Sequence, residues 1–353
     1  MPGEATRPPV YVIIINYNGW RDTIECLESL LRSDYPALSV LVCDNASNDG
    51  SLDHIEAWAR GETPARAANP RLAHVSTPPL PKPLAVTRHT RAALEGTATS
   101  AVGGTHARLM LVSCGANLGF AGANNIGLRW VLRQEPDAMA LLLNNDVVIA
   151  PDAISAMVDL AMRSADVGVV GATILRYHDP ERIETLAGAT LSRVHAMTHM
   201  VNAGANRAAP RPAYPRFDYV TGCCVLTSRA MLERVGLMDE RYFLYGEDVD
   251  WGLRTQRSGL RSIYCPEAEV WHKGGASVSH RSALHDYYDV RGRLMVVHKH
   301  FPGMVPLALV HSAVRCVLPK LLRGQWARLR AAARGCRDFV RFARSHSPAS
   351  TTV

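Results

Sequence analysis

The amino-acid sequence predicts an α/β fold with a mostly parallel, doubly wound sheet flanked by helices. Two observations support this fold class. Apolar, β-branched runs such as VYVIII (10–15) and LSVLVCD (38–44) have the composition of strands that are buried on both faces. Segments with apolar residues at helical spacing lie between such runs, and strands that alternate with helices pair in parallel.

Each of the first two strands is followed by a predicted helix. The helix after strand 10–15 has an apolar face formed by Ile24, Leu27, Leu30 and Leu31. The helix after strand 38–44 begins near NDGS, where Asp49 or Ser51 is expected to cap the first turn. Residues 61–108 are rich in Pro, Ala, Thr and Arg and include STPPLPKPL. We expect most of this segment to be an inserted or mobile loop.

The alternation of strands and helices resumes after this loop. The expected elements are a strand at 108–113, a helix at 121–134, a strand at 138–146, a helix at 151–163 and a strand at 167–175. The helix at 151–163 begins with Pro151, and proline suits the first turn of a helix because no backbone N–H is needed there.

Composition and charge limit the functional classes. The chain of 353 residues is 47% hydrophobic and 20% charged, as in globular proteins. Between His311 and His346, nine Lys or Arg residues accompany one acid, so this segment carries +8 while the whole chain carries +7. A nucleic-acid-binding protein would spread its basic charge over a folded binding face, so we expect no nucleic-acid partner.

The eight cysteines include no CxxC pair and lie mostly in apolar runs, which predicts buried, reduced thiols in a cytoplasmic protein. No N-terminal signal peptide is visible. No uncharged apolar run reaches the roughly 18 residues that a membrane span needs, so no spanning helix is expected.

Polar residues follow three of the predicted strands at their carboxyl ends, where parallel sheets bind ligands. These residues are Asn16, Tyr17, Asn18, Asp44, Asn45, Asn144, Asn145 and Asp146. Asn and Asp are common in any turn, but that explanation weakens when several ends of one sheet share the pattern. The segment NLGFAGANNIG (117–127) is neither a phosphate-binding GxxxxGK[ST] loop nor a dinucleotide-binding GxGxxG turn.

Two residues are candidate metal ligands. Asp146 follows an apolar strand and two asparagines, as expected of a carboxylate that binds Mg²⁺ or Mn²⁺ while a diphosphate supplies further oxygens. His272 follows a short strand, and imidazole also suits Mn²⁺. The alternative for His272 is a structural histidine with its hydrogen bonds satisfied.

The segment LYGEDVDWGLR (244–254) contains three carboxylates, Glu247, Asp248 and Asp250. Acidic residues at a helix start are favoured by the helix dipole. One carboxylate could instead accept a proton from a substrate hydroxyl, as a general base does.

Taken in order, the motifs resemble those of family-2 glycosyltransferases with the GT-A fold, a Rossmann-like architecture. The resemblance is greatest to the rhamnosyltransferase-like branch that builds bacterial cell-surface polysaccharide, and it covers roughly residues 10–300. The motifs are NYN, VCDNASNDGS, NLGFAGANNIG, LLNNDV, TGCCVLTSRAMLERVGLMDERYFLYGEDVDWGLR, WHKGGAS and YYDVRGRLMVVHKHFP. The resemblance implies a GT-A domain at 1–300 and a basic helical tail at 301–353.

The resemblance also implies an inverting transfer of a sugar, with rhamnose favoured, from a nucleotide-diphosphate-sugar to a hydroxyl of a glycan or lipid-linked acceptor. Asp248 matches the catalytic base, and Asp146 with His272 matches the Mg²⁺ or Mn²⁺ site. The residues implied to border the nucleotide-sugar are Asn18, Asp44, Asn45, Asn117, Asn144 and Asn145. The family's Asp-x-Asp element reads Asn-Asn-Asp here, which leaves one carboxylate.

Glu247, Asp250 and Trp251 are expected to contact the acceptor or donor sugar. For Asp250, pairing with Arg254 at the helix start is an equal alternative. The segment TGCCVL (221–226) is expected to line the acceptor side, with Cys223 and Cys224 as packed thiols because an inverting transfer needs no cysteine nucleophile.

Two other functions remain open at the level of sequence. One is a sugar nucleotidyltransferase, which would open with a glycine-rich phosphate loop that VIIINYN lacks. The other is a catalytically inactive nucleotide-sugar-binding protein, against which the presence of both Asp146 and Asp248 argues.

The basic tail has apolar positions among its arginines. They are Val314, Val317, Leu318, Leu321 and Leu322, with a break at Pro319. A solvated basic face is one interpretation. We favour an amphipathic surface that binds an anionic membrane, which would place a cytoplasmic enzyme at the inner face of the cell membrane.

Overall fold

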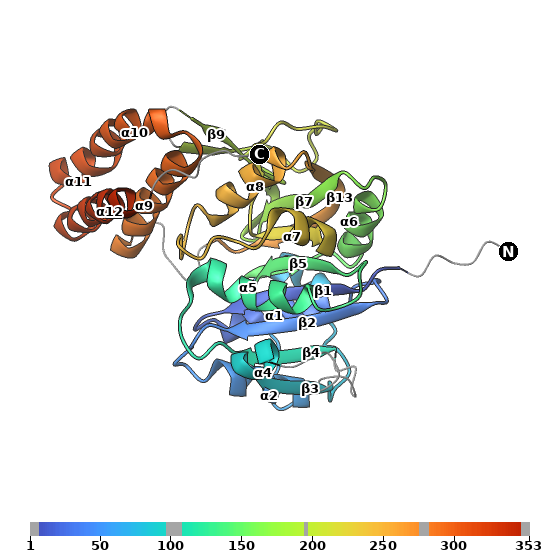
Figure 1. Ribbon diagram of the computed structural model, residues 1–353. Coiled ribbons are helices and arrows are strands. Elements are labelled where there is room, and N and C mark those ends of the chain that lie inside the picture. Colours follow the sequence, from blue (N-terminus) through green and yellow to red (C-terminus); the bar gives the residue numbers. More distant parts are fainter. Residues whose placement is uncertain (1–6, 97–107, 194–196, 275–281, 347–353) are drawn as a thin grey trace.

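The computed structural model describes residues 7–96, 108–193, 197–274 and 282–346, and its centre is one large sheet with helices on both faces (Figure 1). The strand order is β3-β4-β2-β1-β5-β12-β7-β13-β6, with β8 paired to β7. Its strands are β1 (Val10–Asn16), β2 (Leu38–Asp44), β3 (Val86–Thr90), β4 (Leu109–Ser113), β5 (Met139–Asn144), β6 (Val147–Ile149), β7 (Val167–Arg176), β8 (Asp179–Leu186), β12 (Cys224–Ser228) and β13 (Arg261–His272).

The half of the sheet from β3 to β5 is parallel throughout, as the alternating sequence pattern predicted. The other half is mixed, because β12 runs antiparallel to both β5 and β7. Four of the flanking helices are α1 (Trp20–Leu30), α2 (Ser51–Arg60), α5 (Gly119–Val131) and α6 (Ala153–Ala161). The predicted α/β fold class is confirmed.

Burial explains why these segments form this sheet. Val12, Ile13 and Ile14 of β1 are fully buried, so both faces of the strand pack against apolar side chains. Gly127 lets α5 approach the sheet, because a Cβ there would lie 2.6 Å from the Ile13 side chain. Such a strand gains stability on both faces, which accounts for its continuous apolar sequence.

The segment 61–108 is more ordered than its sequence predicts. A short helix α3 (Ala73–Ser76), the edge strand β3 and a helix α4 (Arg91–Gly96) lie within it, while 97–107 are outside the described residues. The prediction of a loop is therefore wrong for residues 86–96. The sequence of β3, VTRHT, is polar because an edge strand is solvated along one side, and its pairing with β4 fixes it.

The helix caps also differ from expectation. The N-cap of α2 is Gly50, in a left-handed conformation, and Ser51 is the first helical residue. Asp49 still satisfies a helix N–H, because its Oδ1 accepts a hydrogen bond from the Ser51 backbone nitrogen at 3.1 Å.

A small second sheet and the remaining helices complete the fold. The small sheet contains β9 (Gly188–Ser192), β10 (Met197–Met200) and β11 (Tyr219–Val220). The helices are α7 (Arg229–Val235), α8 (Glu247–Arg257), α9 (Ala283–His300), α10 (Val305–Ser312), a π-helical turn (Ala313–Val317), α11 (Leu318–Leu322) and α12 (Trp326–Ser345). The helices α9 to α12 form a unit at one end of the molecule (Figure 1).

The C-terminal helical unit begins before the boundary expected from sequence. Helix α12 packs along α9, where Phe339 is buried and Gly335 lies so close that a Cβ would be 2.7 Å from the Tyr287 carbonyl oxygen. The Tyr287 hydroxyl also donates a hydrogen bond to Asp338 at 3.1 Å. The expected boundary at residue 301 therefore falls inside this unit.

One segment contradicts the expectation that no helix could span a membrane. Pro302–Leu322 forms 21 residues of helix with a mean hydropathy of 1.5, long and apolar enough to cross a bilayer by length and composition. Only 17% of its most apolar window is buried in the protein. Arg315 and Lys320 interrupt the apolar sequence of this segment, so a search for an uncharged run does not find it. Length and composition alone do not establish a span.

Candidate active site

The carboxyl ends of β1 and β2 are joined by a hydrogen-bond network. The Asn16 side-chain amide donates to Asp44 Oδ1 at 2.7 Å and to Ser47 Oγ at 3.0 Å. Asp44 Oδ2 accepts from the Ser47 backbone nitrogen at 3.1 Å. Asn18 is exposed, with a positive φ of 51°, and its Oδ1 accepts from the Asn48 backbone nitrogen. The parallel pairing of β1 with β2 brings these residues together.

Asn45 connects the end of β2 to the loop before α5. Its Nδ2 donates to Asn117 Oδ1 at 3.0 Å, and its Oδ1 accepts from the Leu118 backbone nitrogen at 2.8 Å. Asn117 is exposed and also accepts from the Gly119 backbone nitrogen. The structure therefore places Asn18, Asp44, Asn45 and Asn117 around one edge of the sheet, as the sequence predicted.

Asn144 and Asn145 occupy the end of β5 but have different surroundings. The Asn144 backbone nitrogen donates to the Cys223 carbonyl oxygen at 3.0 Å. The Asn145 amide is buried and donates to Thr23 Oγ1 at 3.1 Å. Thr23 in turn donates to Asn16 Oδ1. Asn145 therefore positions the first turn of α1 beside the site rather than projecting into solvent.

Asp146 and His272 lie next to one another, although 126 positions separate them in the chain. Strand β13 pairs antiparallel with β6, and this register sets His272 opposite Val147. His272 Nε2 is consequently 3.4 Å from Asp146 Oδ1, and both side chains are buried for the most part. The two candidate metal ligands therefore lie close enough to bind one ion, as the family resemblance implied.

Glu184 is a further residue of this cluster that was not identified from sequence. Its Oε1 lies 2.9 Å from His272 Nδ1, on the side of the ring opposite Asp146. Strand β8 shifts register against β7 at this point, since Ile174 faces Thr185 and Leu175 faces Ile183. Glu184 is the extra residue of this β-bulge, and bulges re-aim side chains near functional sites.

The two carboxylates around His272 control its protonation. Burial lowers the pKa of the imidazole, but the hydrogen bonds and charges of Asp146 and Glu184 outweigh burial and raise the pKa of His272 to about 10. Without a metal the cluster therefore favours positive charge between its two acids, and a cation that binds there would displace the proton on His272 Nε2.

Asp248 lies at the start of α8 and is half-buried. Its Oδ1 accepts from the Val249 backbone nitrogen at 2.8 Å, and its Oδ2 faces the Gly222 backbone nitrogen at 3.4 Å. Burial raises the pKa of Asp248, while these backbone hydrogen bonds oppose the shift. An oriented carboxylate with a raised pKa is better suited to general-base catalysis than an ordinary aspartate.

Glu247 is buried, and its Oε2 has no hydrogen-bond partner among the described residues. Burial, reinforced by the charge of Asp248, raises the pKa of Glu247 to about 8. Near pH 7 this carboxyl is therefore mostly protonated. Neighbouring carboxyls whose environments separate their protonation states can take different roles in one site.

The loop before α8 is held against α5 in an unusual backbone conformation. Phe243 and Tyr245 both have positive φ values of 64°, which non-glycine residues adopt rarely. The Phe243 carbonyl oxygen accepts from the Phe120 backbone nitrogen at 2.6 Å. Gly119 is required at this contact, because a Cβ there would lie 2.2 Å from that oxygen. Backbone strain of this kind gathers at functional sites.

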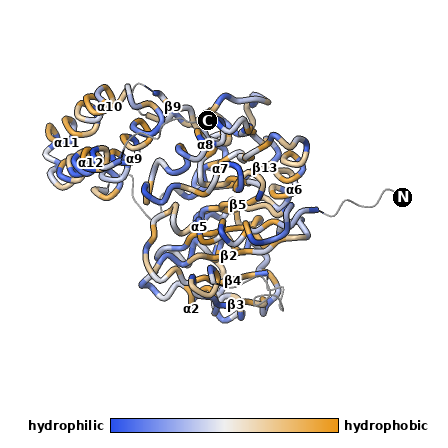
Figure 2. The backbone as a smooth tube through the Cα atoms, viewed as in Figure 1, coloured by the Kyte–Doolittle hydropathy of each residue, from blue (hydrophilic) through white to orange (hydrophobic). Residues whose placement is uncertain are grey.

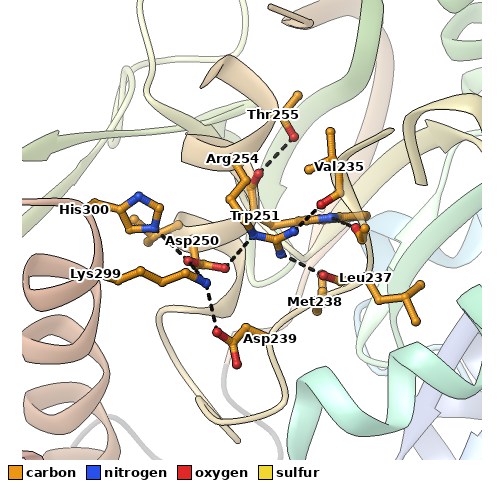
Figure 3. A network of polar contacts seen from close by, with 12 residues as sticks. Val235, Leu237, Met238, Asp239, Asp250, Trp251, Arg254, Thr255, Lys299 and His300 are labelled. Carbon is orange, nitrogen blue, oxygen red and sulfur yellow. Dashed lines mark hydrogen bonds and ion pairs between the residues drawn. The ribbon is translucent and has the colours of Figure 1, made fainter. Parts of the chain in front are cut away.

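Asp250 faces the end of α9 (Figure 3). The side chain is fully buried and contacts Arg254 Nε at 2.9 Å, Lys299 Nζ at 2.7 Å and His300 Nε2 at 2.7 Å. Burial opposes ionisation, but the hydrogen bond from His300 and the charges of Arg254 and Lys299 lower the pKa of Asp250. Its pairing with Arg254, one of the two alternatives, is present.

Trp251 is also buried, and its Nε1 donates to the Gly236 carbonyl oxygen at 2.9 Å (Figure 3). The expectation that Asp250 and Trp251 contact a sugar is therefore wrong for this structure. For Asp250 the reason is helical geometry: residues two apart lie on nearly opposite sides of a helix, so Asp248 and Asp250 cannot face the same ligand. Trp251 is instead held in the core by packing and its indole hydrogen bond.

Cys223 and Cys224 are buried free thiols, as expected. Burial raises the pKa of Cys224 to about 12 and that of Cys223 well above the usual range of a thiol. Neither thiol is activated for nucleophilic chemistry. The backbone of this segment instead connects the end of β5 to the start of α8. The Cys223 carbonyl oxygen accepts a hydrogen bond from the Asn144 backbone nitrogen, and the Gly222 backbone nitrogen faces Asp248 Oδ2.

Comparison with known proteins agrees with this arrangement. Residues 86–293 match the family model described as "Glycosyltransferase like family 2", and residues 11–72 match "Glycosyl transferase family 2". A relative from Mycobacterium tuberculosis, N-acetylglucosaminyl-diphospho-decaprenol L-rhamnosyltransferase, is 29% identical over 58% of this chain and 71% of its own. The low-salt glycan biosynthesis hexosyltransferase Agl10 of Haloferax volcanii is 23% identical over 56% of this chain and 62% of its own.

Two solved structures share the fold at low sequence identity. The mannosyltransferase PcManGT from Pyrobaculum calidifontis, in complex with GDP-Man and Mn²⁺, has a TM-score of 0.50 and 17% identity over 94% of this chain and 87% of its own. A GalNAc-T7 structure with UDP, GalNAc and Mn²⁺ has a TM-score of 0.56 and 12% identity over 98% of this chain and 59% of its own.

The family match extends over more than half of the chain and includes β5, β13 and α8, the elements that carry the acidic and histidine residues of the site. The sheet order and the solved relatives agree on the fold. The chain therefore belongs to glycosyltransferase family 2 and is a hexosyltransferase with the GT-A fold.

Proposed function

We propose that the protein transfers a sugar, with rhamnose favoured, from a nucleotide-diphosphate-sugar to a hydroxyl group of a glycan or lipid-linked acceptor, with inversion at the anomeric carbon. The observation that carries this proposal is the environment of Asp248: a half-buried carboxylate with a raised pKa, held by backbone N–H groups at the edge where the donor-site candidates gather.

In the proposed reaction Asp248 accepts the proton of the acceptor hydroxyl. The acceptor oxygen forms a bond to the anomeric carbon while the bond to the nucleoside diphosphate breaks on the opposite face. Protonated Glu247 is placed to donate a hydrogen bond within the same site rather than to compete for the proton. The oriented Asp248 keeps its acceptor oxygen in one position, which lowers the entropic part of the barrier.

The donor would lie along the carboxyl edge of β1, β2 and β5. We propose that Asn18, Asp44, Asn45 and Asn117 contact its nucleoside, and that Asn144 lies beside its diphosphate. Amide and carboxylate groups already fixed by hydrogen bonds to one another need little rearrangement on binding. The buried Asn145 is assigned a positioning role through Thr23.

The chemistry of the donor set fits a divalent cation, Mg²⁺ or Mn²⁺, on Asp146 and His272. A carboxylate and an imidazole 3.4 Å apart can bind one ion together, and His272 is held by a second carboxylate as metal-binding histidines generally are. The described residues contain no group of three candidate ligands, so oxygens of the donor would complete the shell. Such an ion would neutralise charge on the leaving diphosphate.

The preference for rhamnose and for a lipid-linked acceptor is supported by the mycobacterial relative, whose name describes transfer of L-rhamnose to N-acetylglucosaminyl-diphospho-decaprenol. No observation on this chain favours the alternatives of a nucleotidyltransferase or an inactive binding protein.

Donor binding can be measured before any acceptor is identified. A ligand that binds the native state raises its stability by mass action, so in a series of dTDP-, UDP- and GDP-sugars with Mn²⁺ the donor should raise the melting temperature more than the others do. A shift for that nucleotide-sugar above the shift for its nucleoside diphosphate alone is the expected result. A protein that melts at the same temperature with every nucleotide-sugar, at millimolar concentration and with metal present, would contradict the proposed donor site.

A further inference from the structure

The surface of α10, the π-helical turn and α11 exposes a continuous apolar stripe. It consists of Leu307, Val310, Val314, Leu318, Leu321 and Leu322, which we name the docking face. Their exposed fractions lie between 43% and 77%. The spacing of three and four residues places them along one side of the helix. Hydrophobic colour covers much of α10 and α11 in Figure 2.

The opposite side of the same helix is packed against the protein. Ala308, Ser312 and Cys316 are buried there. Lys320 reaches from this helix to Asp286 of α9 at 3.1 Å, and Arg328 of α12 contacts the same carboxylate at 2.6 Å. The helix is therefore fixed along the surface, and its apolar stripe points outwards.

The helical segment that carries the docking face is also basic. Arg315 and Arg323 of this segment are exposed, and no carboxylate among the described residues pairs with either of them. Arg315 and Arg323 also line a hollow of about 340 Å³ between this helix and α9, together with Arg293. One acid, Asp289, lines the hollow and pairs with Arg293 at 2.5 Å. The hollow is thus positively charged on balance.

We infer that the docking face lies on an anionic membrane surface, with the apolar stripe among the acyl chains and the arginines at the phosphate head groups. An amphipathic helix that also carries basic residues binds anionic lipid through both buried apolar area and charge. The positively charged hollow lies on the side of this helix that faces α9 and adds to the basic character of the C-terminal helical unit.

A lipid surface explains the observations better than the alternatives. A second copy of the chain would bring one set of unpaired arginines against another, which like charges disfavour. A membrane-spanning arrangement would have to detach the helix from α9 and place Arg315 and Lys320 in the hydrocarbon, which is costly. A surface arrangement keeps every contact of the helix with the protein.

The helical unit that carries the docking face contacts the proposed catalytic helix α8 through side chains of α9. Lys299 and His300 at the end of α9 bind Asp250 of α8, two residues from Asp248 (Figure 3). Phe243, in the loop before α8, stacks on Tyr288 of α9 with ring centroids 5.0 Å apart. A membrane that holds α9 to α12 would thereby hold Asp248 at a fixed place relative to the lipid surface.

The test is co-sedimentation of the full-length protein with vesicles of phosphatidylcholine alone or mixed with phosphatidylglycerol. We expect binding to the anionic vesicles only, at low ionic strength. Val310→Gln, Val314→Gln and Leu318→Gln together should lower the partition coefficient by roughly tenfold or more, and so should Arg315→Gln with Arg323→Gln. Glutamine keeps the helix propensity, so the melting temperature should be unchanged.

The matched control changes an exposed apolar residue and an exposed arginine outside the C-terminal helical unit. Met162 is 53% exposed and Arg163 is exposed, both at the end of α6, so Met162→Gln with Arg163→Gln should bind vesicles as the wild type does. This inference is independent of the transfer reaction, because vesicle binding and donor binding are measured separately.

Four results would overturn the inference. They are unchanged vesicle binding in both docking-face variants, equal binding to neutral vesicles, a dimer in sedimentation that these substitutions dissociate, and retention on vesicles through an alkaline carbonate wash. The third would identify a second copy as the occupant, and the fourth would identify a membrane span.

Discussion

Replacement of Asp248 by asparagine should lower kcat by about 10²–10⁴-fold while the protein stays folded and binds donor normally, because the change removes the proton acceptor but keeps its shape. The hydrogen bond from Val249 to the side-chain oxygen survives in asparagine. The lost interaction of the charge with the helix dipole costs only about 0.5–1 kcal/mol of stability. Steady-state kinetics and a melting curve for the same preparation give both quantities.

The pH dependence should identify the same group. A general base is active when deprotonated, so kcat/KM of the wild type should fall as the pH drops through the pKa of Asp248. Because burial raises this pKa, that fall should occur above the pH at which an exposed aspartate titrates. In Asp248→Asn the residual activity should lack this acid limb.

Two control variants separate catalysis from helix stability. Asp53 occupies the first turn of α2 and is exposed, so Asp53→Asn makes the same change at a comparable helix position and should leave kcat unchanged. Glu247→Gln should be milder than Asp248→Asn and should act mainly on KM. Near wild-type turnover in a stable Asp248→Asn protein would leave only the helix-start interpretation and would remove Asp248 from the mechanism.

Removal of the metal should abolish transfer. EDTA should reduce activity to background, and Mg²⁺ or Mn²⁺ should restore it, because the charge on the leaving diphosphate would otherwise be uncompensated. Asp146→Ala should lose the metal-dependent part of donor binding, measured by calorimetry with and without Mn²⁺. Full activity in EDTA would contradict the metal assignment.

Glu184 provides an independent check through affinity rather than activity. Removal of a carboxylate that orients a metal-binding histidine typically costs about 10–100-fold in metal affinity. Glu184→Gln should therefore weaken Mn²⁺ binding by this order, measured by the paramagnetic resonance signal of free Mn²⁺. Glu181 lies on the same strand but pairs with Arg71 at the surface, so Glu181→Gln is the matched control. Equal Mn²⁺ affinity in both variants would exclude the positioning role.

The parallel half of the sheet and its polar edge could be predicted from sequence, because each depends on a local pattern. A strand buried on both faces must be apolar throughout, and the residues after it must turn. Asn16, Asp44 and Asn45 were identified in this way, and parallel pairing then placed them together.

The features that sequence did not reveal depend on strand register or on helix orientation. Glu184 meets His272 only because of a β-bulge in β8, and ERIETL carries no local sign of it. Asp250 was grouped with Asp248 because the two are near in sequence, although a helix turns them apart. Strand β3 was missed because its single neighbour in the sheet leaves a polar edge that has the composition of a loop.

Release of nucleoside diphosphate from a nucleotide-diphosphate-rhamnose, with and without a hydroxyl-bearing N-acetylglucosaminyl-diphospho-polyprenol acceptor, tests transfer by this site most directly. We predict fast release only when acceptor, Mn²⁺ and an intact Asp248 are all present, together with an anomeric configuration in the product opposite to that of the donor. Release of nucleoside diphosphate that is equally fast without any acceptor, or a product that retains the donor configuration, would contradict direct transfer to an acceptor activated by Asp248.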